Sequence, residues 1–227
     1  MKIAVIPARG GSKRIPRKNI KPFAGKPMIG YAIEAAKSSG LFDHVVVSTD
    51  DADIAAVSRE FGAETPFVRP AQLANDHTPT VPVISHAIES CEALGWRIKA
   101  ACCIYPGVPL IQAEDMRQAW AMLESGSQSY VYPVTEFPVP VQQALKRNDA
   151  GLMQSLYPQY ELTRTQDLER TYYDVGQFYW GWRDAWFDNP RILSSGLGLP
   201  IPQWRVVDID TLDDWIRAEL LYKAIHA

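Results

Sequence analysis

Apolar and polar positions follow two alternating patterns over the first 135 residues. Continuous short apolar runs, typical of strands buried on both faces of a sheet, occupy residues 2–8, 44–50, 100–106 and 129–135. Segments with the apolar spacing of amphipathic helices occupy residues 27–40, 51–62, 80–95 and 113–126. This order predicts an α/β fold, with a mostly parallel sheet, helices on both faces and right-handed crossovers.

The pattern breaks after Thr135, where helical periodicity is weak. The stretch KRNDAGLMQSL (residues 146–156) predicts a hairpin with its turn at Asn-Asp-Ala-Gly. Such a hairpin would pack either on its own domain or on a partner subunit. A late strand is expected over Trp204–Asp210, and a closing helix over Thr211–Ile225. We therefore expect one domain over residues 1–227, with a small insertion at about 137–167.

The composition excludes several classes of protein. A chain of 227 residues that is 47% hydrophobic and 22% charged is typical of a water-soluble globular domain. The net charge of −3 and the isoelectric point near 5.8 argue against a general nucleic-acid binder, which needs an extended basic face. No apolar run is long enough to span a membrane, and the start lacks the pattern of a signal peptide. The cytoplasm is the expected compartment.

The three cysteines, Cys91, Cys102 and Cys103, lie in apolar surroundings and have neither metal-ligand nor disulfide spacing. We interpret them as buried, reduced thiols.

A basic loop follows the first predicted strand. The stretch IPARGGSKRIPRKN (residues 6–19) contains five bases and no acid. Functional sites of parallel sheets lie at the carboxyl ends of strands. Glycines let a backbone approach a ligand, and consecutive amides can bind an anion. The loop matches neither the P-loop nor the dinucleotide motif. It therefore predicts a polyphosphate site; the alternative is a solvated run of charge.

The sequence resembles a known family at several motifs. IPARGGSKRIPRKN followed by GKPMIGYAI, together with VVVSTDDADIAAVSREFGAE, FVRPAQLANDHTPT and VVDIDTLDDW, resembles the cytidylyltransferases that activate nonulosonic acids, the sialic-acid-like nine-carbon keto sugars. These motifs span nearly the whole chain in order. RTYYDVGQFYWGW is most similar to the pseudaminic acid branch. The resemblance implies a Rossmann-like, GT-A-like nucleotidyltransferase fold, CTP and a nonulosonic acid as substrates, and Mg²⁺ as the metal.

The implied reaction is attack of the sugar's anomeric hydroxyl on the α-phosphate of CTP, which releases pyrophosphate and forms a CMP-sugar. In it, the resemblance assigns triphosphate contacts and leaving-group stabilisation to Arg9 and Lys18, and metal binding to Asp208 and Asp210. It implies that the remaining nucleotide contacts come from Ala8, Gly11, Ser12, Lys13, Asn19, Arg69 and Asp76. Ala8 and Arg69 would contact the cytosine base, Ala8 through its backbone. For Arg69 the alternative is a surface ion pair.

The metal pair also has an argument from spacing. Residues two apart in a strand point to the same face, so Asp208 and Asp210 could share a hard cation through oxygen ligands. The alternative is that they cap the following helix. Asp213 and Asp214 fit that capping role better, which favours the metal reading of Asp208 and Asp210.

The sugar side is defined by departures from the sialic acid pattern. Tyr105 stands where sialic acid enzymes carry a glutamine that contacts the sugar, which argues against sialic acid. Gln177, Phe178 and Tyr179 would form a wall around the sugar's acyl groups; the alternative is that this aromatic cluster is simple core. The resemblance further implies a homodimer in which the hairpin closes the partner's sugar pocket. In that arrangement Arg164 or Arg170 would meet the sugar carboxylate.

Three alternatives remain open at this point. One is the same chemistry on sialic or legionaminic acid. Another is a non-catalytic nucleotide-sensing module, against which the intact Arg9, Lys18, Asp208 and Asp210 count. The last is a glycosyltransferase with a mid-chain DxD motif, which is disfavoured because the plain match, Asp208-Ile-Asp210, lies near the C-terminus.

Overall fold

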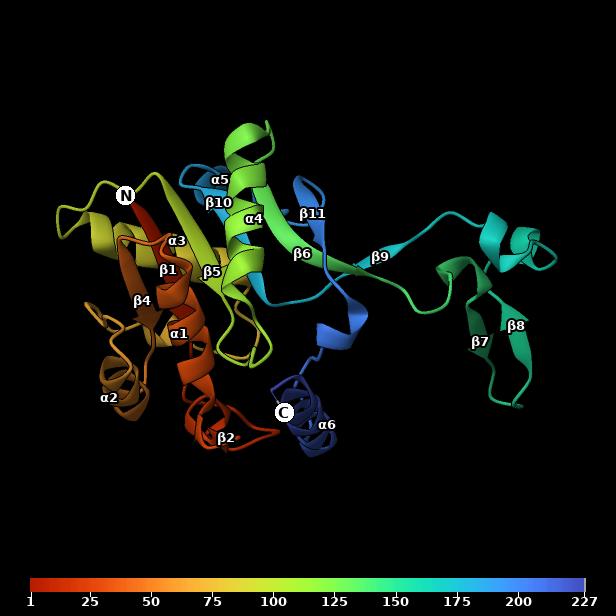
Figure 1. Cartoon of the computed structure of the whole chain (residues 1–227), viewed down its shortest axis with the longest axis horizontal. Helices are drawn as coiled ribbons and strands as arrows, with labels where there is room; N and C mark the ends of the chain where they lie inside the picture. The colour runs from red at the N-terminus through yellow and green to blue at the C-terminus, as the bar shows by residue number, and fades with distance from the viewer. Residues whose placement is uncertain (227) are drawn as a thin grey trace.

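The computed structural model describes residues 1–226, and its body is built on a mixed sheet of seven strands (Figure 1). The strand order is β11-β6-β10-β5-β1-β4, and β9 pairs with β6. The strands are β1 (Lys2–Pro7), β4 (His44–Ser48), β5 (Ala100–Ile104), β6 (Tyr130–Glu136), β9 (Tyr172–Asp174), β10 (Phe178–Trp182) and β11 (Gly196–Pro200). The predicted α/β class is confirmed.

Helices cover both faces of this sheet. The helices of residues 1–226 are α1 (Met28–Ser39), α2 (Ala52–Glu60), α3 (Thr80–Glu92), α4 (Ala113–Ser125), α5 (Ala185–Asp188) and α6 (Leu212–Ile225), of which α6 packs in a separate cluster and not on the sheet. Alternate residues of β1 serve different cores: Ala4 and Ile6 pack with α1 and α4, whereas Ile3 and Val5 pack with α3 and α5. This two-sided burial explains why the strands are continuously apolar.

The centre of the sheet departs from a purely parallel arrangement. β10 lies between β5 and β6 and is antiparallel to both. Gly181 pairs with Tyr130 there, and a Cβ on Gly181 would lie 2.7 Å from the Tyr130 ring. The absence of a side chain therefore lets the tyrosine ring cross the strand. β11 then adds a parallel edge beside β6.

The predicted strand over Trp204–Asp210 is wrong. Gln203–Arg205 form a 3₁₀ turn, and residues 206–210 pair with no strand. Val207 and Ile209 are buried in a separate cluster with α6 and the residues around α1. These two apolar side chains are buried, as in a strand, but they meet a helix, and the place at the sheet edge belongs to β11.

Side chains cap the starts of two helices, and of the two aspartates expected to cap the last helix Asp214 takes part. Asp51 caps α2, accepting hydrogen bonds from the amides of Asp53 and Ile54. Thr211 and Asp214 form a capping box at the start of α6. The three cysteines are buried and unbonded.

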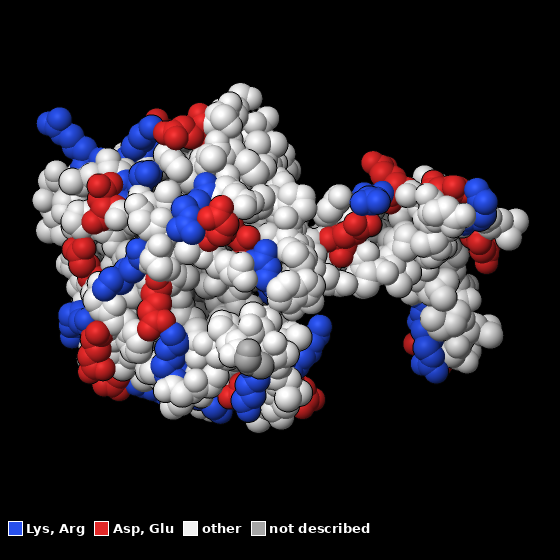
Figure 2. Space-filling model, in the orientation of Figure 1, with Lys and Arg blue, Asp and Glu red and all other residues white. Residues whose placement is uncertain are grey.

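An arm emerges between β6 and β9 and stands away from the body (Figures 1 and 2). It carries the predicted hairpin, formed by β7 (Leu145–Arg147) and β8 (Met153–Ser155). A further small hairpin, β2 (Pro22–Phe23) with β3 (Lys26–Pro27), precedes α1. Within residues 1–226, no helix is both long and apolar enough to cross a membrane.

Candidate active site

A cavity of about 570 Å³ opens beyond the carboxyl ends of β1 and β5. The sequence predicted ten of the 24 residues that line it. Those predicted residues are Arg9, Ser12, Lys13, Lys18, Asn19, Arg69, Asp76, Tyr105, Asp208 and Asp210. The basic loop thus forms one wall and the segment before α6 forms the other.

The basic loop is held against the end of β4. The Gly10 amide donates to Oδ1 of Asp50 at 3.1 Å, and a Cβ on Gly10 would lie 2.6 Å from Oδ2 of Asp51. Only a glycine fits this close approach. Arg17 adopts the left-handed region (φ 58°) and pairs with Asp51 and Asp53. Arg17 therefore anchors the loop to α2 and does not line the cavity.

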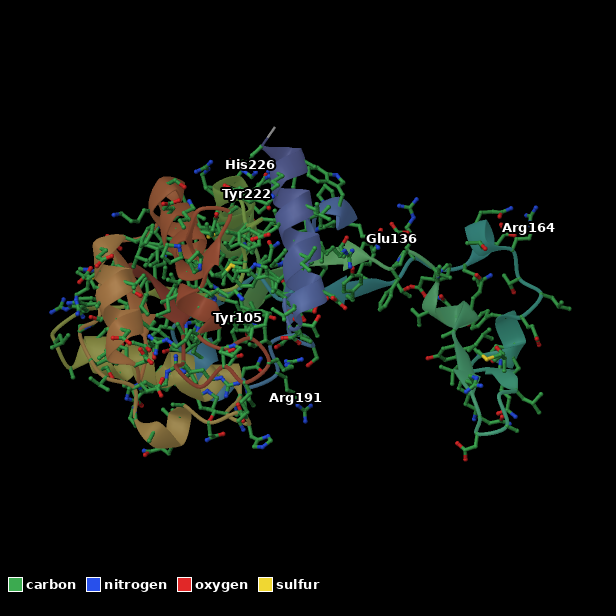
Figure 3. The ribbon with its side chains drawn as sticks, turned by 90° about the horizontal axis from the view of Figure 1, so that it is seen from below. Tyr105, Glu136, Arg164, Arg191, Tyr222 and His226 are labelled. Carbon is green, nitrogen blue, oxygen red and sulfur yellow. The ribbon has the colours of Figure 1, made fainter. Side chains whose placement is uncertain are left out.

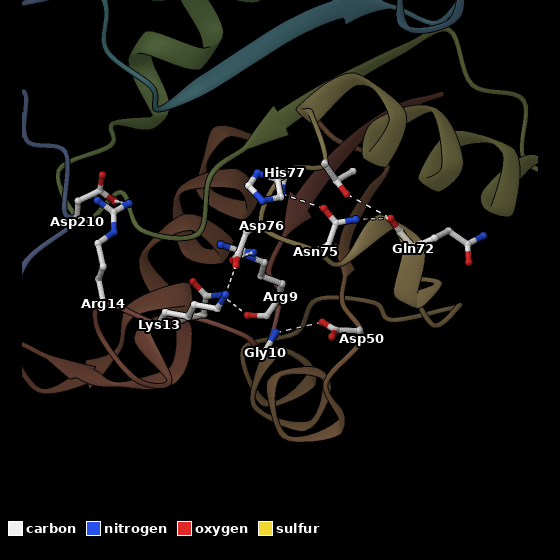
Figure 4. A network of polar contacts seen from close by, with 12 residues as sticks. Arg9, Gly10, Lys13, Arg14, Asp50, Gln72, Asn75, Asp76, His77 and Asp210 are labelled. Atoms are coloured by element: carbon white, nitrogen blue, oxygen red, sulfur yellow. Dashed lines mark hydrogen bonds and ion pairs between the residues drawn. The ribbon is translucent and has the colours of Figure 1, made fainter.

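Two cations of the loop converge on one carboxylate. Arg9 and Lys13 both contact Asp76, with Nζ of Lys13 at 2.5 Å from Oδ2 (Figure 4). Hydrogen bonds from Lys13 and Arg9 hold the pKa of the Asp76 carboxyl below its usual value. An anionic ligand that binds Arg9 and Lys13 would therefore compete with the Asp76 carboxylate for them.

Lys18 connects the loop to the opposite wall. Its Nζ donates to the carbonyl oxygen of Ile209 at 2.7 Å and lies 3.7 Å from Oδ1 of Asp210. The neighbouring Asn19 is buried and donates from Nδ2 to the carbonyl of Arg9 at 3.0 Å. The Lys18 bond fixes the position of its ammonium group at the cavity wall, and the Asn19 bond fixes the conformation of the basic loop.

The carboxylates of Asp208 and Asp210 both face the cavity, while Val207 and Ile209 are buried. Asp210 pairs with Arg14 at 2.9 Å (Figure 4). Partial removal from solvent raises the pKa of Asp208, and the negative charge of Asp210 raises it further. Two carboxylates that repel each other in this way are suited to share a cation.

The donor chemistry of this pair fits a divalent hard cation. Both ligands are oxygens, and Mg²⁺ is usually held by one or two carboxylates together with water and substrate phosphates. Among residues 1–226, no group of three or more His, Cys, Asp or Glu is arranged to hold a metal. The remaining ligands would therefore have to come from a bound substrate and water.

Arg69 is buried at the back of the cavity, with 4% of its surface exposed. Its guanidinium donates to the carbonyl oxygen of Ser48, and its Nε donates to Ser48 Oγ at 3.1 Å. Desolvation lowers its pKa to about 10, so it remains charged at neutral pH. The surface ion pair considered for Arg69 is ruled out by this burial.

Several predicted residues do not line the cavity. Ala8 is buried between two lining residues, and Gly11 has open space around its Cα. Gln177, Phe178 and Tyr179 are buried in or beside β10, behind the cavity wall that Tyr105 and Gly176 provide. Phe178 belongs to the core on the α1 and α4 side of the sheet.

Neither of the two arm arginines lines this cavity within one chain. Figure 3 shows Arg164 on the arm, well separated from Tyr105. Arg164 pairs with Asp167 at 2.7 Å, and Arg170 lies 3.7 Å from Glu136 at the base of the arm. A contact with the sugar would therefore require the arm to meet another copy of the chain.

Some lining residues were missed by the sequence reasoning, among them Asn75, Thr78, Thr80, Gly107 and Gly176. Thr80 is the first residue of α3, so its place after the loop 71–79 could have been inferred from the helix start. The others follow strands or lie in loops whose paths depend on long-range packing.

The chain is similar to known proteins over most of its length. The cytidylyltransferase family model matches residues 3–172. The chain is 38% identical over 225 residues to the pseudaminic acid cytidylyltransferase of Campylobacter jejuni serotype O:2, covering 99% of this chain and 97% of that one. It is 36% identical over 117 residues to the CMP-N,N'-diacetyllegionaminic acid synthase of Legionella pneumophila, covering 52% of this chain and 50% of that one.

Solved structures support the fold. The structure of CMP:2-keto-3-deoxy-manno-octonic acid synthetase complexed with CTP superposes with a TM-score of 0.70 and 19% identity, covering 100% of this chain and 99% of that one. With the family match over residues 3–172, the chain belongs to the cytidylyltransferases, the nucleotidyltransferases that use CTP.

Proposed function

We propose that this protein transfers CMP from CTP to the anomeric hydroxyl of a nine-carbon keto sugar acid, with pseudaminic acid as the favoured substrate, and releases pyrophosphate. The observation that carries the proposal is the cavity itself, in which the bases of the first loop face the carboxylates of Asp208 and Asp210. A nucleoside triphosphate needs cations for its phosphates and hard oxygen ligands for its metal. The choice of sugar rests on the full-length similarity to the pseudaminic acid cytidylyltransferase of C. jejuni.

Arg9, Lys13 and Lys18 would bind the triphosphate. The β- and γ-phosphates would displace the Asp76 carboxylate from Arg9 and Lys13, because a polyphosphate carries more charge than one carboxylate. Lys18 lies deeper, beside Asp210, and would stabilise the charge that develops as pyrophosphate leaves. Ser12 would add a hydroxyl and Gly11 an unobstructed backbone to the same cradle.

Asp208 and Asp210 would hold Mg²⁺, which when bound neutralises phosphate charge. The chain's own contribution is to keep both carboxylates facing the cavity, by burying Val207 and Ile209 on the other side. Arg14, which pairs with Asp210, would then be released toward phosphate oxygens, while Lys18 stays held by the Ile209 carbonyl.

The nucleoside would lie against the buried side of the loop. Arg69 supplies a guanidinium that is already fixed by Ser48, so little side-chain entropy is lost when it donates to the base carbonyl. The Ala8 amide donates to the same Ser48 carbonyl at 3.0 Å, Asn19 lines the same cavity, and Asp76, once displaced, would face the nucleotide.

The sugar acid would bind on the Tyr105 side of the cavity, with Gln177, Phe178 and Tyr179 shaping it from behind. To test the function, the protein is incubated with CTP, Mg²⁺ and, separately, pseudaminic, legionaminic and sialic acid, and pyrophosphate release is followed. We expect release with pseudaminic acid. Faster release with sialic or legionaminic acid would assign the other substrate, and nucleotide binding without release from any sugar would point to a sensing module.

The arm supports a proposal on assembly: the protein forms a homodimer in which each arm covers the partner's sugar pocket. Large apolar side chains are exposed on the arm, and Leu162 is 98% exposed. A two-stranded hairpin is marginal in water, so its apolar side chains need a partner to cover them. In a two-fold dimer the same contact would be made twice. Arg164 and Arg170 would then reach the sugar carboxylate of the other subunit.

Replacing Leu152 and Met153 on the arm by aspartate should convert the dimer to a monomer. These side chains are 65% and 55% exposed in the single chain, so the substitutions do not disturb its own core. Light scattering should give a mass near twice 25.4 kDa for the wild type and near 25.4 kDa for the variant. The variant should keep CTP affinity and lose most sugar use. Leu94→Asp, on an exposed turn of the body, is the matched control. A monomeric wild type with full activity contradicts the dimer.

A further inference from the structure

A hydrogen-bonded carboxylate lies behind the sugar side of the cavity and has no role in the proposal above. Asp174 ends β9, its Oδ2 accepts from the hydroxyl of Tyr179 at 2.6 Å, and its Oδ1 accepts from the amide of Gly176 at 2.9 Å. Both carboxylate oxygens are thus engaged, one by a buried side chain and one by the loop that lines the cavity.

Tyr179 in turn packs against the cavity wall. Its ring meets the Tyr105 ring edge to face, with centroids 5.6 Å apart and planes at 75°. Tyr132 lies on another side of it, and the Tyr132 hydroxyl is fixed to the Leu193 carbonyl at 2.7 Å. Only 5% of Tyr179 is exposed, so its hydroxyl depends on Asp174 for a partner.

Tyr105, which contacts Tyr179, is itself a lining residue of the cavity. Its hydroxyl lies 2.7 Å from Oγ1 of Thr80, and both residues line the cavity. Its amide donates to the Gln177 carbonyl at 2.9 Å, which fixes the backbone at the same place. The Tyr105 and Thr80 hydroxyls therefore form a pair at the cavity wall, and either hydroxyl can donate a hydrogen bond to a ligand or accept one from it.

Burial keeps both tyrosines neutral. It raises the pKa of Tyr105 to about 12, and the Asp174 charge adds to this rise. Burial also raises the pKa of Tyr179 well above its ordinary value. Their hydroxyl protons are therefore available for hydrogen bonding throughout the neutral range, and Asp174 sets the direction of the Tyr179 bond.

We propose that Asp174 is a positioning residue for the sugar: through Tyr179 it fixes Tyr105, so that the Tyr105–Thr80 hydroxyl pair presents a fixed edge to a hydroxyl or acylamino group of the sugar acid. This inference rests on the proposed function. It adds Asp174 and Thr80 to the determinants of sugar use and leaves the nucleotide side unaffected, because neither residue contacts the basic loop or the Asp208–Asp210 pair.

Asp174 also ties this edge to the arm. The arm leaves β6 after Glu136 and returns at Tyr172, two residues before Asp174. At its root, the Phe137 and Tyr173 rings pack at a tilt of 53°, with centroids 4.9 Å apart, and the Phe137 amide donates to the Thr171 carbonyl at 3.0 Å. A movement of the arm root would therefore be transmitted to Tyr105 through Asp174 and Tyr179.

The test is a double-mutant cycle on Asp174→Asn and Tyr179→Phe, with KM measured separately for sugar and CTP. Each single variant should raise the sugar KM about five- to tenfold. This is the factor expected when one neutral hydrogen bond between the Tyr105–Thr80 hydroxyl pair and the sugar is lost. The double variant should be no worse than either one, because the two residues act through one contact. KM for CTP should change less than twofold. Asp184→Asn removes an exposed carboxylate that pairs with Arg183, and it is the matched control.

Thr80 is tested by a conservative pair. Thr80→Val removes the hydroxyl and should raise the sugar KM, whereas Thr80→Ser keeps it and should restore wild-type values. Equal increases in the sugar and CTP KM, or additive effects in the double variant, would overturn the inference and indicate a general structural role. Wild-type turnover with an unchanged sugar KM in Tyr179→Phe would overturn it too, while leaving the proposed function intact. If the wild type forms no CMP-sugar at all, the proposed function fails and this inference fails with it.

Discussion

Replacing Lys18 by alanine is expected to slow turnover by a factor of roughly 30 to 1,000, which corresponds to about 2–4 kcal/mol of lost transition-state stabilisation. Lys18 is half-enclosed, its Nζ is held by the Ile209 carbonyl, and it lies 3.7 Å from Asp210. It is therefore fixed in position before the reaction begins, between the phosphate cradle and the proposed metal ligands. A preorganised cation of this kind acts most strongly on charge that develops during the reaction.

The expected signature is a fall in kcat with a smaller change in the KM for CTP, because Arg9 and Lys13 would still bind the ground-state phosphates. Steady-state kinetics with the sugar saturating would measure it. Lys18→Met keeps the apolar stem and separates loss of charge from loss of packing. Lys21→Ala is the matched control, because Lys21 lies over the Trp215 ring at 5.2 Å and does not line the cavity. Near-wild-type turnover in Lys18→Met would refute the assigned role.

Replacing Asp210 by asparagine is expected to abolish most Mg²⁺-dependent activity while the fold is kept. An amide is a poorer ligand for a hard cation than a carboxylate, and the change also removes the charge that Arg14 and Lys18 now pair with. The loss of that charge should also lower the pKa of Asp208, since Asp210 contributes to its elevation. Asp208 would then stay ionised but would be the one carboxylate left of the pair, so metal binding is expected to weaken.

Titration of Mn²⁺ in the presence of CTP, followed by electron paramagnetic resonance, would report metal binding without any need for turnover. We expect the wild type to show a site that Asp210→Asn weakens at least tenfold. Asp213→Asn is the matched control, because Asp213 lies in the first turn of α6 and does not line the cavity. An unchanged titration in Asp210→Asn would move the metal to other ligands.

Local patterns alone predicted much of the fold. The strands at 2–8, 44–50, 100–106 and 129–135, the four helices between them and the hairpin in the arm match the structure closely. Continuous apolar runs and helical periodicity are set by which faces are buried, and this information is local. The same holds for the basic loop, where adjacent residues supply the charges, the glycines and the position at a strand end.

The predictions failed where an element's neighbour lies far away in the chain. Trp204–Asp210 has the apolar content of a strand, yet Val207 and Ile209 pack under α6, and Gly196–Pro200 takes the place beside β6. An apolar run indicates that side chains are buried but does not say whether a strand or a helix buries them. The antiparallel place of β10 in the centre of the sheet was likewise beyond the sequence pattern.

The sequence by itself determined the chemical inventory of this protein: a basic, glycine-containing loop after the first strand, a spaced pair of aspartates near the end, and an α/β framework that brings such residues to one edge. The tertiary structure alone decided how they pair. It set Asp76 against Arg9 and Lys13, buried Arg69 on Ser48, and linked Asp174 to Tyr105 through Tyr179. These contacts join residues from different strands and loops, and their energies depend on distance, burial and direction, which exist only once the chain has folded.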